Sequence, residues 1–285
     1  MAYFRSRLLI LATILCLSIS FQTISIQHTW AQEQTEEAKT EPNLSVEEMT
    51  QFLLKAKIKS GKNTSSGVTR PYKLTLSDGK LTHDAGFQSI DDFKNYIQFP
   101  DGTTEINFRD TYQFNLAAYE MAKLLDLQYM LPVTVKRKWK GKTGSLTWWI
   151  DTKMNERERI EKKIPVPDIN EWNKQMNRVF VFSQLIYDTD RNATNLLYGQ
   201  DWDLYMIDFS RAFRRHKELP HPEVLVACDR ELLEKIRQLD PDEVKRVLKS
   251  YLSKSELEAL MARRDEIVAH FDELVEQKGE NGVLY

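Results

Sequence analysis

The chain has 285 residues, with 40 Lys and Arg side chains against 42 Asp and Glu side chains, and its formal net charge is −2. This near balance excludes the strongly basic composition of a nucleic-acid-binding domain, and the chain is long enough to bury a substantial core. Its two cysteines exclude a disulfide-rich scaffold, and its five histidines show no zinc-binding spacing.

The amino terminus has the pattern of a secretory signal peptide. A charged start is followed by the apolar run from Leu8 to Ile19, which is too short to span a bilayer comfortably. We predict a signal peptide over residues 1–31, with cleavage after Ala31, and a disordered polar leader over residues 32–43. An exported protein without a stable transmembrane anchor follows, and an uncleaved anchor is the alternative.

Strand-like runs dominate the next part of the chain. Two of them enclose a polar loop, Ser60 to Gly67, whose composition offers free backbone N–H groups to phosphate oxygens, although a Gly/Ser tip also suits any surface hairpin. The predicted strands are Phe52 to Ile58, Val68 to Leu76 and Leu81 to Ile90.

An amphipathic helix is predicted from Asp110 to Leu125, because its apolar residues recur at helical spacing. Glu120 borders the apolar stripe, where a carboxylate requires a cation unless it faces solvent. Two further strands, Leu131 to Arg137 and Gly144 to Asp151, follow this helix.

The second half of the chain is mostly helical in pattern. The charged run from Met154 to Lys163 indicates an exposed linker, and Trp172 to Tyr187 a helix. Further helices are expected from Asp229 to Leu239, after the N-cap Asp240, and after a capping box at Ser255 and Glu258.

A carboxylate-rich turn precedes a short hairpin in this half. The runs Leu196 to Tyr198 and Leu204 to Ile207 are strand-like, and a pairing centred between Asp201 and Trp202 places Asn195 opposite Asp208. An amide oxygen and a carboxylate would then lie within reach of one cation. Asp190 lies just before them, where it could accept a proton from an attacking hydroxyl.

Two other interpretations of this turn compete with a cation site. Asp and Asn side chains can simply satisfy their own backbone in an Asx turn. The turn departs from a calcium-binding EF-hand loop, because Ala193 stands where the loop needs Gly and Gly199 where it needs Glu.

The segment from Asp190 to Ser210 resembles the atypical branches of the protein kinase-like fold, such as phosphatidylinositol 3- and 4-kinases, HipA-like kinases and secretory-pathway kinases. Asp190-Arg-Asn-Ala-Thr-Asn195 matches the D-x-x-x-x-N catalytic loop, and Asp208-Phe-Ser210 matches D-F-G with Ser for Gly. The resemblance implies that Asp190 is the catalytic base. It also implies that Asn195 and Asp208 hold Mg²⁺ or Mn²⁺ on ATP.

The resemblance also assigns nucleotide-binding residues in the first half of the chain. Gly61, Ser65, Ser66 and Gly67 would belong to the loop that covers the nucleotide. The lysine that holds the phosphates and pairs with a helix glutamate should end the run Ala85-Gly-Phe-Gln88, but this chain has Gln88 there. Either Lys73 on the preceding strand takes that role, or Gln88 takes it with a hydrogen bond and the phosphate charge is neutralised less well. Glu120 would be the helix glutamate.

The sequence therefore predicts an α+β, two-lobed protein kinase-like fold, with a β-rich lobe over residues 44–149 and a mainly helical lobe over residues 150–285. The predicted function is an exported atypical kinase that uses ATP and Mg²⁺ or Mn²⁺ to phosphorylate a hydroxyl on a protein, lipid or small molecule. Gln88 and Ser210 favour the alternative, a pseudokinase or a nucleotide- or partner-binding module without transfer.

Overall fold

The computed structural model describes residues 44–64, 71–98, 102 and 104–285. The predicted signal peptide, the leader and the loop residues Ser65, Ser66 and Gly67 lie outside the described residues. Of the helices in the described ranges, none is long and apolar enough to cross a membrane.

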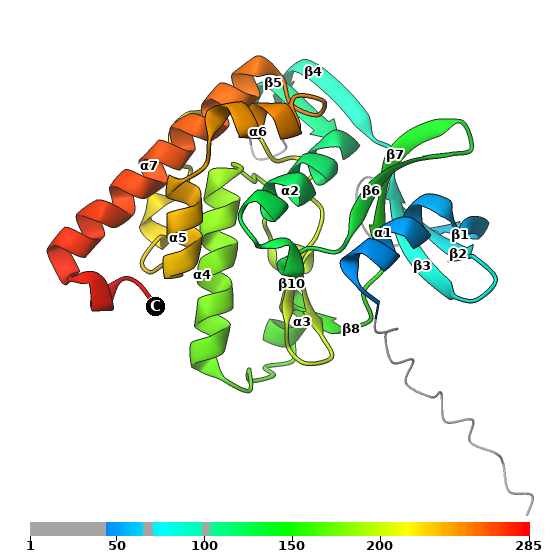
Figure 1. The fold of residues 1–285 in the computed structure, drawn as a ribbon, viewed down its shortest axis with the longest axis horizontal. Helices are drawn as coiled ribbons and strands as arrows, with labels where there is room; N and C mark the ends of the chain where they lie inside the picture. Colours follow the sequence, from blue (N-terminus) through cyan, green and yellow to red (C-terminus); the bar gives the residue numbers. More distant parts are fainter. Residues whose placement is uncertain (1–43, 65–70, 99–101, 103) are drawn as a thin grey trace, which may run out of the picture. The chain divides into compact units, whose positions relative to one another are not determined.

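The first half of the described chain is built on one antiparallel sheet with the strand order β1-β2-β3-β7-β6 (Figure 1). Its elements are α1 (Val46–Lys55), β1 (Lys57–Asn63), β2 (Tyr72–Ser77), β3 (Thr82–Gln88), β6 (Thr134–Trp139) and β7 (Lys142–Trp148). A separate hairpin, β4 (Asp91–Gln98) and β5 (Thr104–Thr111), leads directly into α2 (Tyr112–Leu124).

The two faces of the five-stranded sheet differ in character. Leu74, Phe87 and Leu146 are buried on one face, which packs against Phe52 and Leu53 of α1. Because side chains alternate along a strand, Lys73, Gly86, Gln88 and Thr147 lie on the opposite face. One face is therefore closed by α1, and the other carries the predicted nucleotide-binding side chains.

The strand predicted from Phe52 to Ile58 is wrong. Phe52 to Lys55 form the last turn of α1, and β1 begins at Lys57. The helix starts at a capping box in which the Ser45 hydroxyl accepts from the Glu48 amide while Glu48 accepts from the Ser45 amide. The buried residues of α1, Phe52 and Leu53, are adjacent and lie near its carboxyl end. The run that starts at Phe52 therefore shows no helical spacing of apolar residues and resembled a strand.

Gly61 lies within β1, opposite Leu74 of β2, and not in the predicted loop. A Cβ atom at Gly61 would lie 2.5 Å from Leu74 Cδ2 and 2.9 Å from Trp139 Cζ2. Glycine is required here because two core side chains pack against its backbone. This contact is on the core face, away from Lys73 and Gln88.

The second half of the chain is mainly helical and has a small three-stranded sheet of order β10-β9-β8. Its elements are β8 (Thr152–Asn155), α3 (Glu156–Glu161), α4 (Ile169–Leu185), β9 (Leu196–Gly199), β10 (Leu204–Met206), α5 (Arg230–Arg237), α6 (Pro241–Leu248) and α7 (Lys254–Lys278). α2 contacts both β7 and α6, so it joins the sheet to these helices (Figure 1). The capping box of α7 is Ser253 with Glu256, two residues earlier than predicted.

The exposed linker predicted from Met154 to Lys163 is also wrong, because its charges are partly paired and buried. It contributes the second half of β8 and all of α3, and Glu156 is buried. Arg159 donates to both Glu156 oxygens at 2.6 and 2.8 Å, and the Tyr198 hydroxyl donates to Glu156 at 2.7 Å. Trp172 Nε1 donates to the Tyr198 hydroxyl at 2.8 Å. This network connects α3, α4 and β9.

Replacing Glu156 by Gln should lower the free energy of unfolding at pH 7 by about 2 kcal/mol, because it breaks charged hydrogen bonds in a buried site. Burial opposes ionisation of Glu156, but the bonds from Arg159 and Tyr198 outweigh it and lower its pKa. A carboxyl whose pKa is lower when folded stabilises the fold above its unfolded pKa and loses that effect as pH falls through the folded pKa. The difference between wild type and variant should therefore shrink in acid.

Denaturant unfolding at several pH values measures this difference. Glu161→Gln is the matched control, because Glu161 lies exposed on the same helix. Equal losses of stability in the two variants would contradict the role given to Glu156.

Candidate active site

The hairpin that carries the predicted metal residues is paired one residue away from the predicted register. Tyr198 pairs with Leu204, so the pairing is centred on Asp201, and the Ile207 amide donates to Asn195 O at 3.1 Å. The loop has an odd number of residues, Gln200, Asp201 and Trp202, and the last of them has a left-handed φ of 69°. Asn195 therefore lies opposite Ile207, and Asp208 follows one residue beyond.

Arg191 holds the Asp190 loop and the hairpin together. Its Nη1 donates to the carbonyl oxygens of Asn195 and Ile207, both at 2.8 Å, while Nε and Nη2 donate to Asp188 Oδ2 at 3.0 and 2.6 Å. The Asp188 side chain is fully buried, and the guanidinium lies 4.5 Å from the centre of the Phe209 ring. Buried ion pairs of this kind constrain geometry because each charge needs its partner.

The structure brings Asp190 and Asn195 together. Asn195 Nδ2 donates to Asp190 O at 2.9 Å, an orientation that turns Asn195 Oδ1 away from that bond. The Asp190 carboxylate accepts from Asn192 Nδ2 at 2.9 Å, and the Asp190 amide donates to Asp188 at 3.0 Å. The turn therefore does contain Asx hydrogen bonds, and they position the Asp190 carboxylate.

Asp208 adopts a left-handed backbone conformation, with a φ of 55°. Such a conformation is costly for a residue other than Gly and is often found at functional sites. Its Oδ1 lies 3.4 Å from Gln88 Nε2 and 3.4 Å from the Ser210 amide. Gln88 of β3 and Asp208 therefore lie within hydrogen-bonding distance of each other.

Asn115 of α2 is a site residue that the sequence analysis missed. Its Nδ2 donates to Gln88 Oε1 and, at 3.3 Å, to Ser145 Oγ, while its Oδ1 accepts from the Phe209 amide at 2.7 Å. One buried amide thus links β3, β7 and the segment after β10. The available signal was a polar residue within the apolar stripe of a predicted helix.

Lys73 and Glu120, which the resemblance predicts as a pair, each pair with another residue in the structure. Glu120 pairs with Lys123 one turn along α2, at 2.7 Å, and Asn115 is the α2 residue that faces Gln88. Lys73 pairs with Asp84 at 3.1 Å and lies 4.3 Å from the centre of the Trp149 ring. Gln88, which stands where the resemblance expects the strand lysine, therefore meets a neutral amide of α2 and not a glutamate.

Asp84 is ionised in this pair. Its burial opposes ionisation, but hydrogen bonds from Thr75 and Lys73 and the charge of Lys73 outweigh this, and the pKa of Asp84 lies below its usual value. Lys73 would have to leave Asp84 to reach a phosphate near Gln88.

A small pocket adjoins Asp208 on the polar face of the sheet. Its lining includes Asn115, Thr134 of β6, Thr147 of β7 and Asp208. The two threonine hydroxyls are 3.0 Å apart. The polar face of the sheet and the hairpin residues therefore border one space.

The residues fit a divalent cation shared with a phosphate ligand. In the described ranges no three His, Cys, Asp or Glu side chains gather into a metal site of their own. Mg²⁺ is usually held by one or two protein oxygens together with water and substrate phosphates. Asp208 and Asn195 carry carboxylate and amide oxygens, which are ligand types that such a site uses. The observed register places Asn195 opposite Ile207, so the two side chains do not face each other across the hairpin as predicted.

Neither a family model nor a curated protein matches the sequence, but solved structures resemble the fold. A structure of hydra Fam20 with sugar is 13% identical, covers 86% of this chain and 93% of its own, and has a TM-score of 0.59. The Golgi casein kinase is 13% identical, with 84% and 77% covered and a TM-score of 0.60. The fold is that of an atypical kinase. The proinflammatory kinase CtkA of Helicobacter pylori is also similar, at 10% identity, with 80% and 97% covered and a TM-score of 0.50.

This kinase-like fold confirms the predicted two-lobed α+β architecture, with a β-rich first half and a helical second half. At such low identity the likeness concerns the fold alone. The roles predicted for Asp190, Asn195 and Asp208 therefore stay predictions.

Proposed function

We propose that the chain is an exported atypical kinase that transfers the γ-phosphate of ATP to a hydroxyl acceptor, with Mg²⁺ or Mn²⁺. The observation that carries this proposal is the Arg191 network, which ties the Asp190 loop to the hairpin bearing Asn195 and Asp208. The meeting of Gln88 with Asp208 adds the polar face of the sheet. Export rests on the signal-peptide pattern of residues 1–31.

In this proposal each residue has one task. Asp208 and Asn195 would hold the cation, which neutralises charge on the nucleotide phosphates when bound. Asp190 would accept the proton of the acceptor hydroxyl. Gln88 would donate a hydrogen bond to a phosphate oxygen, and Lys73 would add charge after leaving Asp84. The loop that starts after β1 and contains Ser65, Ser66 and Gly67 would cover the phosphates.

A binding module without transfer is the second candidate. The neutral pair of Gln88 and Asn115 favours it, because a site without the strand lysine neutralises phosphate charge less well.

ATP should stabilise the protein only when Mg²⁺ or Mn²⁺ is present, and a site filled to about 100 times its dissociation constant should add about 2.7 kcal/mol. Thermal-shift titrations with ATP, with metal and with both measure this. Asp208→Asn should abolish the metal-dependent part of the shift. Asp201→Asn, in the exposed turn of the same hairpin, is the matched control.

Stabilisation by ATP that needs no metal and survives Asp208→Asn would contradict the cation site. The absence of any nucleotide effect would contradict both the kinase and a nucleotide-binding module.

A further inference from the structure

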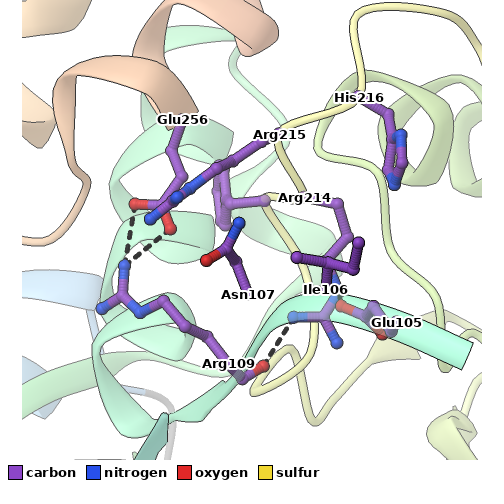
Figure 2. A pocket seen from close by; sticks show the side chains of 9 residues that line it. Glu105, Ile106, Asn107, Arg109, Arg214, Arg215, His216 and Glu256 are labelled. Atoms are coloured by element: carbon purple, nitrogen blue, oxygen red, sulfur yellow. Dashed lines mark hydrogen bonds and ion pairs between the residues drawn. The ribbon is translucent and has the colours of Figure 1, made fainter. Parts of the chain in front are cut away.

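A pocket of about 210 Å³ lies among β5, the segment 213–216 and the start of α7 (Figure 2). None of its lining residues belongs to the proposed phosphotransfer site. The lining comprises Glu105, Ile106, Asn107, Arg109, Phe213, Arg214, Arg215, His216 and Glu256.

Positive charge exceeds negative charge in this lining. Arg109 Nη1 lies 2.7 and 2.8 Å from the two Glu256 oxygens, and Arg214 Nε lies 3.0 Å from Glu105 Oε1. Within each of these two pairs the positive and negative charges cancel. Arg215 is exposed and forms no ion pair with any residue of the described chain, so its charge remains for a ligand.

Arg214 has unused hydrogen-bonding capacity although its side chain is only 6% exposed. Its Nη1 donates to Arg109 O at 2.6 Å, but Nη2 is buried and has no hydrogen-bond partner within the described ranges. The Nε contact with Glu105 is an ion pair without hydrogen-bond geometry. A buried guanidinium donor without an acceptor is costly, and an oxyanion in the pocket would remove that cost.

The surrounding contacts hold two of the guanidinium groups in place. Arg214 lies over the Phe108 ring at 5.1 Å, and Arg109 lies over the Phe114 ring at 4.7 Å. Their carboxylate partners come from β5 and from the first turn of α7, where Glu256 also accepts from the Ser253 amide. Arginines fixed in this way lose little conformational entropy when they bind a ligand.

We propose that this pocket binds a phosphate group. Arginines from β5 and from the segment 213–216 border one space, and a tetrahedral phosphate can accept from several planar guanidinium groups at once. A planar carboxylate offers fewer oxygens. Glu105 and Glu256 are already matched by arginines, so a cation would meet the unpaired charge of Arg215.

Isothermal titration of the full chain with inorganic phosphate, at constant ionic strength, tests this site. Arg215→Gln should weaken binding about 10-fold, the usual effect of losing one charge-assisted hydrogen bond. Lys217→Gln removes the same charge from an exposed neighbour outside the lining and should leave binding unchanged. Glu105→Gln should tighten binding because it removes a competing anion. O-phosphoserine is titrated as a second ligand. Tighter binding of O-phosphoserine than of inorganic phosphate would indicate a phosphorylated side chain, and the reverse would indicate the free ion.

Three results would overturn the proposal. The first is no saturable binding of either ligand by wild type. The second is an equal loss in Arg215→Gln and Lys217→Gln, which would indicate unspecific charge. The third is binding that disappears in Asp208→Asn but survives in Arg215→Gln, which would place the phosphate in the proposed phosphotransfer site. Arg214 is left intact because its replacement endangers folding.

Discussion

Replacing Asp190 by Asn is expected to lower phosphate transfer by about 10²- to 10⁴-fold, the usual contribution of a general base, while leaving the affinity for Mg²⁺ and ATP nearly unchanged. The Asp190 carboxylate accepts from Asn192, whereas Asn195 donates to the main-chain oxygen of Asp190, which the substitution keeps. The change should therefore leave Asn195 in place. Asp208→Asn should instead weaken both nucleotide binding and transfer. Labelled ATP, incubated with the protein alone and with an extract of its compartment, measures transfer to the protein itself and to acceptors.

The exposed Asp201 supplies the control for this pair of variants, because Asp201→Asn changes a carboxylate of the same hairpin at a distance from the site. Parallel losses of binding and transfer in Asp190→Asn would contradict a role as base. If wild type transfers no label with either metal yet binds ATP, the enzyme proposal fails and the binding module replaces it.

The neutral pair of Gln88 and Asn115 should be convertible into an ion pair. Asn115→Asp alone should lower the free energy of unfolding by about 3 kcal/mol, because it buries a carboxylate close to Asp208 without a cation. Gln88→Lys alone should lower the free energy of unfolding by less, since the Asp208 carboxylate can partly compensate the new positive charge. The free energy of unfolding of the double variant should be about 1 to 3 kcal/mol higher than the sum of the two single effects predicts.

Denaturant unfolding of wild type, both single variants and the double variant measures this coupling. Asn115→Asp combined with Gln200→Lys is the control, because Gln200 is exposed in the β9–β10 turn and the added charge is remote from Asn115. Additive effects in the Gln88 cycle, or equal recovery in the control, would show that the two side chains do not pair.

Elements with strong periodicity were predicted well from the sequence. The helix expected from Asp110 to Leu125 is α2, the helix expected from Trp172 to Tyr187 lies largely in α4, and the two strands after α2 are β6 and β7. In these segments the apolar period and the flanking turn residues agree with the final packing. The hairpin between Asn195 and Asp208 was also recognisable, because its turn chemistry is local.

Features that depend on long-range partners were not predictable in the same way. The charged run around Glu156 looked exposed, because the burial of Glu156 depends on Tyr198 and Trp172 from distant segments. The hairpin register was one residue off because Trp202 adopts a left-handed conformation that no residue-type preference favours. The only signal from Asn115 was a polar residue in an apolar stripe, which does not identify its partners, since β3, β7 and Phe209 meet it only in the folded chain.

The pair of amides between β3 and α2 has a consequence for the conditions under which the site can assemble. Dissolved salt screens charges over distances of about 10 Å at 0.1 M, and it weakens an exposed lysine–glutamate contact accordingly. Gln88 and Asn115 carry no net charge, so this link between strand and helix is indifferent to ionic strength. This contact between β3 and α2 should therefore persist at salt concentrations that weaken an exposed lysine–glutamate pair.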